Sequence, residues 1–347
     1  MKRVNGRRAI RFAFRAIGLL LLLLLLVSFA LLVPQRGPLA PTGDYAVATA
    51  QYTLVDEDRI EALSDTGAFR RVNVTCWYPE AGAGALPLVV FSHGAFGLRT
   101  SNVSLYTELA SHGYLVCSID HPYHALWTKG LGGRLTLLDM GYMAELGRED
   151  AKTDKQQSLA YYQKWMATRM GDLNFVLDTM LAGAADGADS VWGLLDVTRI
   201  GVMGHSLGGA AALGIGRQRG DIGAVIALEA PFMYDIIGVE NDEFVFIRAD
   251  YPAPVLNVYS DASWEHLAEW PQYARNHALL VESKASVRNV HIAGIGHLAL
   301  TDLAISNPWL VWLLDGPKAT KDSSEGLRAI NAECLAFFDR YLRGQQD

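Results

Sequence analysis

Short β-rich runs alternate with longer helical patterns from residue 48 to the end of the chain, and this alternation constrains the fold most. Eight runs have the length and composition of strands: residues 51–55, 72–78, 86–92, 114–119, 199–203, 224–229, 255–259 and 288–292. Helical patterns cover residues 101–112, 153–181, 207–217, 265–278 and 324–342. Such alternation is typical of a mostly parallel sheet with helices on both faces. We therefore expect one α/β domain at residues 48–347 with an eight-stranded sheet.

The N-terminal segment has the features of an export or anchoring sequence. Residues 1–15 hold six Lys or Arg and no acid, and residues 16–33 form an uncharged stretch that includes eight consecutive leucines. Eighteen apolar residues lie at the boundary between a signal peptide and a spanning helix. We expect a transmembrane anchor whose basic end stays in the cytoplasm, with residues 34–47 as a Pro-rich tether. A signal segment cleaved near Ala30 is the alternative, and the domain would then be secreted.

The charge balance and the cysteines exclude several classes of function. The first 36 residues carry seven of the 30 basic side chains and no acid, so 23 basic and 37 acidic side chains remain, a net charge of −14. An acidic domain without a basic, aromatic-rich patch is not expected to bind nucleic acid. Cys76, Cys117 and Cys334 are widely spaced and form no C-x-x-C pair, which argues against a zinc site. We expect Cys76 and Cys117 to be buried thiols, with a disulfide between them as the alternative.

Residues 204–208 read Gly-His-Ser-Leu-Gly and fit the nucleophile elbow G-x-S-x-G. An apolar strand precedes the motif and a helix rich in small residues follows it, which is the context that the elbow requires. The glycines allow a strained turn that projects the serine hydroxyl into a cleft and places it at a helix N-terminus. The motif predicts that Ser206 is a nucleophile.

A serine hydroxyl needs an imidazole to take its proton and to pass it to the leaving group. His297 lies in a Gly-rich loop after the last predicted strand, and it is the last histidine of the chain. His291 falls inside that strand pattern and is interpreted as structural. We therefore expect His297 to be the general base.

The loop after the third predicted strand begins His93-Gly94-Ala95-Phe96-Gly97. Its glycines let the backbone approach a developing oxyanion. We expect the backbone N–H groups of Ala95 and Leu207 to form an oxyanion hole, with the His93 side chain as a hydrogen bonder that shapes the loop.

Residues 91–100, together with Leu-Ala-Ser-His-Gly-Tyr at 109–114 and Asp-His-Pro at 120–122, resemble the platelet-activating factor acetylhydrolases of the plasma and intracellular type II group. Residues 169–178 are similar to that family's helix before the nucleophile strand. The resemblance covers roughly residues 70 to 302. It implies an α/β-hydrolase fold, a serine, acid and histidine triad and hydrolysis of short acyl esters, sometimes on phospholipids. Bacterial members of this broad group include general esterases, so the substrate does not carry over.

Two carboxylates compete for the role of the triad acid. Asp261 follows the seventh predicted strand, the commonest place for this acid in the fold at large. Glu229 follows the sixth strand, where the resembling family carries its catalytic aspartate. We favour Glu229, with Asp261 as the alternative. Either would hold the imidazole tautomer and stabilise its charged form.

These features together predict a serine hydrolase that cleaves a carboxylic ester through an acyl-enzyme on Ser206, with no metal and no organic cofactor. A small-molecule or lipid ester is the expected substrate, and residues 126–149, an irregular stretch rich in Gly, Leu and Met, are a candidate lid. A peptidase or a thioesterase would use the same residues, and a catalytically silent binding protein of the cell envelope is the alternative from another class. The sequence does not indicate an oligomeric state.

Overall fold

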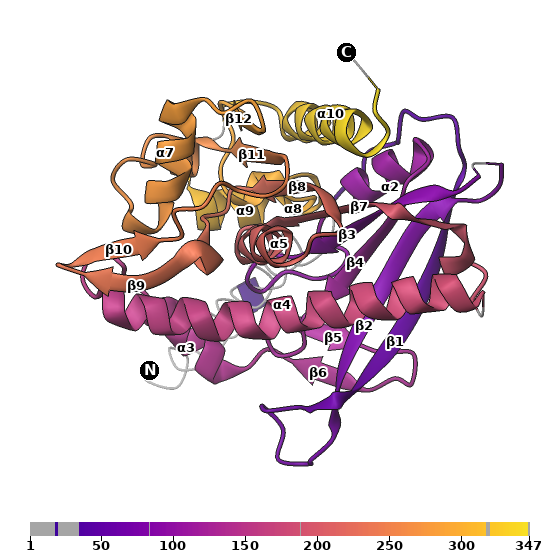
Figure 1. Cartoon of the computed structure of the whole chain (residues 1–347), viewed down its shortest axis with the longest axis horizontal. Coiled ribbons are helices and arrows are strands. Elements are labelled where there is room, and N and C mark those ends of the chain that lie inside the picture. The colour runs from indigo at the N-terminus through magenta and orange to yellow at the C-terminus, as the bar shows by residue number, and fades with distance from the viewer. Residues whose placement is uncertain (1–17, 20–34, 83, 188, 317–319, 346–347) are drawn as a thin grey trace, which may run out of the picture.

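The computed structural model describes residues 18–19 and 35–345, except residues 83, 188 and 317–319. In this part of the chain, eight strands form one sheet in the order β1-β2-β4-β3-β7-β8-β11-β12 (Figure 1). These strands are β1 (Val47–Ile60), β2 (Phe69–Pro79), β3 (Leu86–Ser92), β4 (Leu115–Asp120), β7 (Leu195–His205), β8 (Ile222–Leu228), β11 (Val255–Tyr259) and β12 (Val287–His291). Every run predicted as a strand lies in or overlaps one of them, so the predicted α/β class with an eight-stranded sheet is confirmed.

The strand directions bring several loops to one edge of the sheet. β1 pairs with β2, and β2 with β4, in antiparallel fashion, whereas β4, β3, β7, β8, β11 and β12 are parallel neighbours. The central strand β3 is buried along its whole length, as expected of a strand covered on both faces. Because parallel strands end at the same edge, the loops after β3, β7, β8 and β12 lie near one another.

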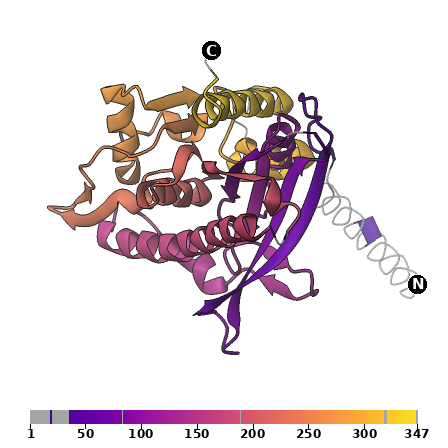
Figure 2. The ribbon, with the colours of Figure 1, turned by 45° about the vertical axis from the view of Figure 1, so that its right-hand side comes forward.

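Helices cover both faces of the sheet. The main helices are α2 (Val103–Ser111), α4 (Lys155–Asp186), α5 (Leu207–Gln218) and α10 (Ser323–Leu342). Side chains of β3 alternate between the two cores: Leu88 and Val90 pack with α4 and α5, and Val89 and Phe91 with α2 and α10. Figure 1 and Figure 2 show α10 above the sheet and α4 below it, with the strands between them.

The chain between β11 and β12 differs from the prediction of one helix over residues 265–278. The structure has α6 (Asp261–Trp264), a short 3₁₀ turn (Pro271–Tyr273) and α7 (Ala274–Glu282) instead. Proline lacks a backbone N–H and clashes with the preceding turn of a helix, so Pro271 begins a new element. The hairpin of β9 (Ile236–Glu240) and β10 (Glu243–Phe246), and the helices α8 (Leu303–Ser306) and α9 (Pro308–Asp315), were not predicted.

Residues 126–149 form regular elements rather than an irregular stretch. β5 (Trp127–Lys129) and β6 (Leu135–Leu137) make a small antiparallel hairpin, and α3 (Met140–Arg148) follows it. The Asp139 side chain caps α3 by accepting a hydrogen bond from the Tyr142 backbone. Figure 1 shows this segment below the main sheet, beside β2 and α4. A role as a lid stays a prediction.

The expectation that Cys76 and Cys117 are buried thiols is wrong, and the alternative of a disulfide holds. Cys76 on β2 and Cys117 on β4 are joined by a disulfide, and Cys334 is a buried free thiol. The antiparallel register of β2 and β4 sets Cys76 directly opposite Cys117, which brings the two side chains within bonding reach.

The predicted anchor or signal segment at residues 16–33 lies outside the described residues apart from Gly18 and Leu19. Among the residues that are described, no helix has the length and apolar character needed to cross a membrane. The described part of the expected tether at residues 34–47 makes hydrogen bonds to the domain. The backbone N–H groups of Leu39, Thr42 and Gly43 donate to side chains of α2.

Candidate active site

Ser206 lies in a tight turn between β7 and α5, at the edge where the parallel strands end. Its φ of 54° falls in the left-handed region, which is rare for a residue with a side chain. The neighbouring glycines are required sterically. A Cβ at Gly208 would lie 2.0 Å from the Ser92 carbonyl oxygen, and one at Gly204 would lie 2.4 Å from the Gly208 carbonyl carbon. The sequence motif therefore forms the strained strand-to-helix elbow that it predicts.

Glu229 follows β8 and is 1% exposed. Its backbone also has a positive φ, of 51°. Oε1 accepts hydrogen bonds from the hydroxyls of Ser260 and Ser263 at 2.7 and 2.5 Å and from both of their backbone N–H groups. These donors fix the carboxylate in one orientation. The sequence analysis did not assign the two serines to this site, because nothing in their local pattern shows which carboxylate they face.

His297 is the partner of Glu229. Its Nδ1 donates to Glu229 Oε2 at 2.7 Å, although the two residues are 68 positions apart in the chain. Its side chain is 34% exposed, so one edge of the ring is open while Glu229 is enclosed. The His297 backbone oxygen accepts a hydrogen bond from His205 Nε2 at 3.1 Å, which ties His297 to the residue before Ser206.

The serine and the imidazole are neighbours without a direct bond. The rings of His205 and His297 have centroids 4.5 Å apart, and Ser206 directly follows His205. Within the described residues, Ser206 Oγ makes no hydrogen bond. Such bonds commonly form only when a substrate is in place.

Asp261 binds a different histidine. Its Oδ1 accepts from His291 Nε2 at 2.7 Å, and its Oδ2 accepts from the Gly294 backbone N–H at 2.9 Å. The Asp261 backbone N–H donates to the Ile295 carbonyl. Of the two candidate acids, the structure places Glu229 on His297 and Asp261 on the start of the loop that carries His297.

Electrostatics reinforce the contact between Glu229 and His297. Burial alone would raise the pKa of Glu229, but the hydrogen bond and the charge of His297 outweigh burial and lower it. Burial alone would lower the pKa of His297, but the bond to Glu229 raises it above 6.5. Burial, and next the charge of His297, lower the pKa of His205 to about 3, so His205 stays neutral.

The expected oxyanion donors lie beside Ser206. A Cβ built on Gly94 would be 3.3 Å from Ser206 Cβ and 2.8 Å from His205 Nδ1, so the loop after β3 runs against the elbow. In the described part of the chain, the backbone N–H groups of Ala95 and Leu207 donate to no other residue. His93 shapes this loop as expected, since its Nδ1 donates to Gly94 O and its Nε2 accepts from the His121 backbone N–H.

The sequence model of the family described as platelet-activating factor acetylhydrolase, isoform II, matches residues 65–131 and 174–347. The chain belongs to this family. The resemblance inferred from residues 91–122 and 169–178 is therefore confirmed, and the match includes Ser206, Glu229 and His297.

Curated relatives of this family member include acetylhydrolases and cutinases. It is 24% identical over 275 residues to the platelet-activating factor acetylhydrolase of Canis lupus familiaris, a match that covers 75% of this chain and 58% of that protein. It is 28% identical over 194 residues to cutinase est1 of Thermobifida alba, which covers 56% of this chain and 50% of that protein. The chain thus spans about half to three fifths of the length of these relatives.

A solved structure shares the fold of this acetylhydrolase family member. A ferulic acid esterase from Streptomyces cinnamoneus superposes with a TM-score of 0.65 at 24% identity, covering 89% of this chain and 93% of that one. The likeness shows the α/β-hydrolase-like fold that the elbow motif and the resemblance imply.

Proposed function

We propose that this chain is a serine hydrolase that cleaves a carboxylic ester through an acyl-enzyme on Ser206. The observation that carries the proposal is the 2.7 Å bond between His297 Nδ1 and buried Glu229, next to a serine on a strained elbow. This arrangement fixes the imidazole with Nδ1 protonated, so Nε2 is free to accept a proton. The names of the relatives, acetylhydrolase, cutinase and ferulic acid esterase, support an ester as the substrate.

The chemistry proceeds in two halves. Ser206 Oγ attacks the ester carbonyl carbon while its proton passes to His297 Nε2, and the carbonyl oxygen becomes an oxyanion. The N–H groups of Ala95 and Leu207 stabilise that oxyanion, and Glu229 stabilises the imidazolium. The C–O bond to the alcohol then breaks as His297 returns its proton to the leaving oxygen. Water repeats these steps on the acyl-enzyme and releases the acid.

We expect short acyl esters to be the best substrates. The test is hydrolysis of p-nitrophenyl esters from acetate to palmitate, with Ser206→Ala as the background. Release of p-nitrophenol above that background, fastest for short chains, supports the proposal. A folded preparation that matches Ser206→Ala on every ester contradicts it, and cleavage restricted to thioesters or peptides indicates one of the alternative hydrolases.

We also propose that the domain works outside the cytoplasm, anchored through residues 16–33. The basic residues 1–15 followed by 18 uncharged ones support this. Two residues after that segment, the Gln35 backbone donates to the carbonyl of Ser306 at the end of α8, next to α9, whose Trp309 and Trp312 are more than half exposed. Retention in membranes after carbonate washing is the expected result. A mature N-terminus near Leu31 in intact-mass spectrometry would show a cleaved signal instead.

A further inference from the structure

Arg169, on α4, is a fully buried cation. Its Nη1 donates to the His93 carbonyl oxygen at 2.5 Å and its Nη2 to the Gly94 carbonyl oxygen at 3.2 Å. Its side chain is 0% exposed, and within the described residues it forms no ion pair. Both carbonyls belong to the loop that runs against Ser206.

Two other arginines whose side chains are largely enclosed are neutralised by carboxylates. Arg70 is held by Asp172 and Glu61, and Arg217 by Asp235. An isolated buried charge costs several kcal/mol unless it is compensated, so an unpaired one is expected to serve a purpose.

The histidines around Arg169 do not offset its charge. Burial, and next the charge of Arg169, hold the pKa of His93 and of His124 well below 6.5 and lower that of His121 to about 4. All three rings are therefore neutral near pH 7. His121 instead bridges Ser92 Oγ and the Asp172 carboxylate, at 2.8 and 2.9 Å.

The geometry of a trans peptide links Arg169 to the oxyanion hole. In the peptide unit between Gly94 and Ala95, the C=O and the N–H point in opposite directions. Arg169 and His93 both donate to the Gly94 oxygen, so they lie on one side of this unit and the Ala95 N–H points to the other. Hydrogen bonds to the carbonyl also polarise the unit, which strengthens its N–H as a donor.

We propose that Arg169 is a positioning residue that orients the Ala95 N–H toward the oxyanion formed at Ser206, and that its unpaired charge stabilises this oxyanion. The proposal rests on the proposed function. It predicts that Arg169 acts on the transition state and not on binding of the neutral ester.

The test compares Arg169→Met and Arg169→Lys with Arg217→Lys, a change at a largely enclosed, neutralised arginine near the end of α5. We expect Arg169→Met to lower kcat by roughly 100-fold, about the loss of one oxyanion-hole donor, with KM changed less than threefold. Arg169→Lys, which keeps the charge, should recover part of the loss, and Arg217→Lys should keep kcat within about threefold of the parent.

Affinity for a trifluoromethyl ketone distinguishes weaker oxyanion stabilisation from a loss of folded protein. This inhibitor adds to the serine and forms an oxyanion. Its affinity should fall in parallel with kcat/KM across the Arg169 variants when activity is normalised to the sites titrated by a fluorophosphonate. If Arg169→Met does not fold, Arg169→Lys alone carries this comparison. Unchanged kcat per titrated site, or a loss confined to KM, would overturn the proposal. Full activity of Ser206→Ala would instead defeat the proposed function itself.

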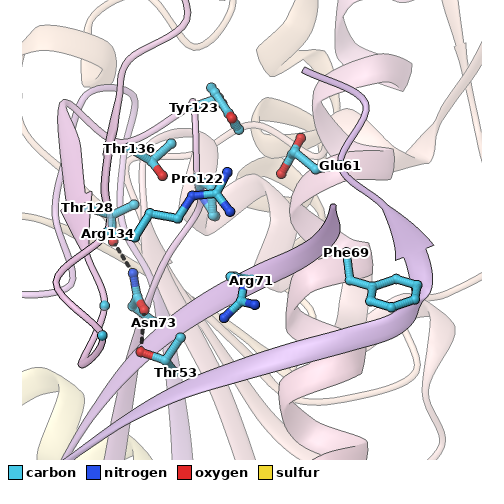
Figure 3. A pocket seen from close by; sticks show the side chains of 12 residues that line it. Thr53, Glu61, Phe69, Arg71, Asn73, Pro122, Tyr123, Thr128, Arg134 and Thr136 are labelled. Carbon is cyan, nitrogen blue, oxygen red and sulfur yellow. Dashed lines mark hydrogen bonds between the residues drawn. The ribbon is translucent and has the colours of Figure 1, made fainter. Parts of the chain in front are cut away.

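A second inference rests on a hollow on the β1–β2 side of the sheet. It lies between the β1–β2 ribbon and the β5–β6 hairpin and has a volume of about 60 Å³. Figure 3 shows the side chains of Arg71, from β2, and Arg134, from the hairpin, directed into it. Neither guanidinium forms a hydrogen bond or an ion pair with any residue that the structure describes.

Several other polar groups of the hollow already have hydrogen-bond partners. Glu61 accepts from Arg70 and from the Leu63 backbone. Asn73 bonds to Thr53 and Thr128, as the dashed lines in Figure 3 mark. Arg71 and Arg134 are exposed guanidinium groups within residues 37–347, which carry a net charge of −14. They form a local positive site, and their planar forks match an oxyanion. We infer that this hollow binds a carboxylate or phosphate group, either free or as part of the ester substrate.

Calorimetric titration with inorganic phosphate and with acetate, at constant ionic strength, tests this site without relying on catalysis. Binding should be lost in Arg71→Gln and Arg134→Gln and kept in Arg328→Gln, a matched change at an exposed arginine on α10. The ratio of kcat/KM for p-nitrophenyl hydrogen succinate to that for p-nitrophenyl butyrate identifies the source of the anion. If this ratio falls about tenfold in the Arg71 and Arg134 variants, the anion is part of the substrate. If the ratio is unchanged while the parent still binds phosphate or acetate, the anion is a free one. If no variant differs from the parent in either assay, the site does not exist.

Discussion

The site contains two pairs of a histidine and a carboxylate, Glu229 with His297 and Asp261 with His291. Both have a ring nitrogen to carboxylate oxygen distance of 2.7 Å, yet their surroundings differ. Glu229, which binds His297, is 1% exposed and receives four further hydrogen bonds on Oε1. The side chain of Asp261, which binds His291, is 31% exposed. A carboxylate out of water interacts far more strongly with an imidazolium than one in contact with water. The contact distance alone therefore does not identify the catalytic pair.

The second pair contacts the backbone of the loop that carries His297. Asp261 binds the Gly294 and Ile295 backbone, and on the far side of His297 the Asp315 carboxylate accepts from the Leu298 backbone N–H at 2.7 Å. Asp261 and Asp315 therefore bind the backbone on either side of His297, while Glu229 binds its imidazole ring. The following predictions test this division of roles.

Ser206→Ala should have the largest effect. If the Glu229 and His297 pair serves to activate Ser206, removal of the hydroxyl should lower kcat by about 10⁶-fold, the loss seen when a serine protease loses its nucleophile. The thermal midpoint should change little, since Ser206 Oγ makes no bond within the described residues. If the variant retains more than a few per cent of the activity, the nucleophile is a residue other than Ser206.

Glu229→Gln should have the next largest effect. The amide keeps the shape of the carboxylate but removes the charge that stabilises the imidazolium, so kcat should fall by about 10⁴-fold, as in the corresponding change of a serine protease. Steady-state kinetics on a short-chain ester, with circular dichroism to verify folding, measure this. A loss of less than tenfold would mean that Glu229 is not the triad acid.

The pH profile reports the same pair. His297 must be neutral to act as a base, and Glu229 raises its pKa above 6.5, so the acid limb of kcat/KM should have its midpoint above 6.5. Activity should fall about tenfold for each pH unit below that midpoint. In Glu229→Gln, the acid limb of the residual activity should have its midpoint at a lower pH. If that midpoint does not move, Glu229 does not raise the pKa of the group that acts as the base.

Asp261→Asn should have the smallest effect. The amide can still accept one of the two bonds to His291 and Gly294, so we expect kcat within about fivefold of the parent and a loss of about 1 kcal/mol in the free energy of unfolding. Urea denaturation and kinetics on the same ester measure both. A large loss of kcat at unchanged stability would give Asp261 a direct catalytic role.

The sequence predicts the sheet and the elbow because both depend on local pattern. Alternating apolar runs locate the eight strands, and Gly204 and Gly208 mark a turn whose flanking positions have no room for a Cβ. Pairings between distant residues depend on strand order and register, which local pattern does not contain. The sequence therefore left Glu229 and Asp261 as alternatives, did not indicate that Ser260 and Ser263 bind Glu229, and favoured free thiols for Cys76 and Cys117, which the β2 and β4 register joins.

The most direct test of the division between the two pairs is the rate at which a fluorophosphonate labels Ser206 in the parent, Glu229→Gln and Asp261→Asn, with the adduct located by peptide mass spectrometry. We expect label on Ser206 in all three proteins, a rate in Asp261→Asn within about fivefold of the parent, and a rate in Glu229→Gln lower by several orders of magnitude, in line with the loss expected for the triad acid. Label on another residue, or a slower reaction in Asp261→Asn than in Glu229→Gln, would contradict the assignment of Glu229 and His297 as the pair that activates Ser206.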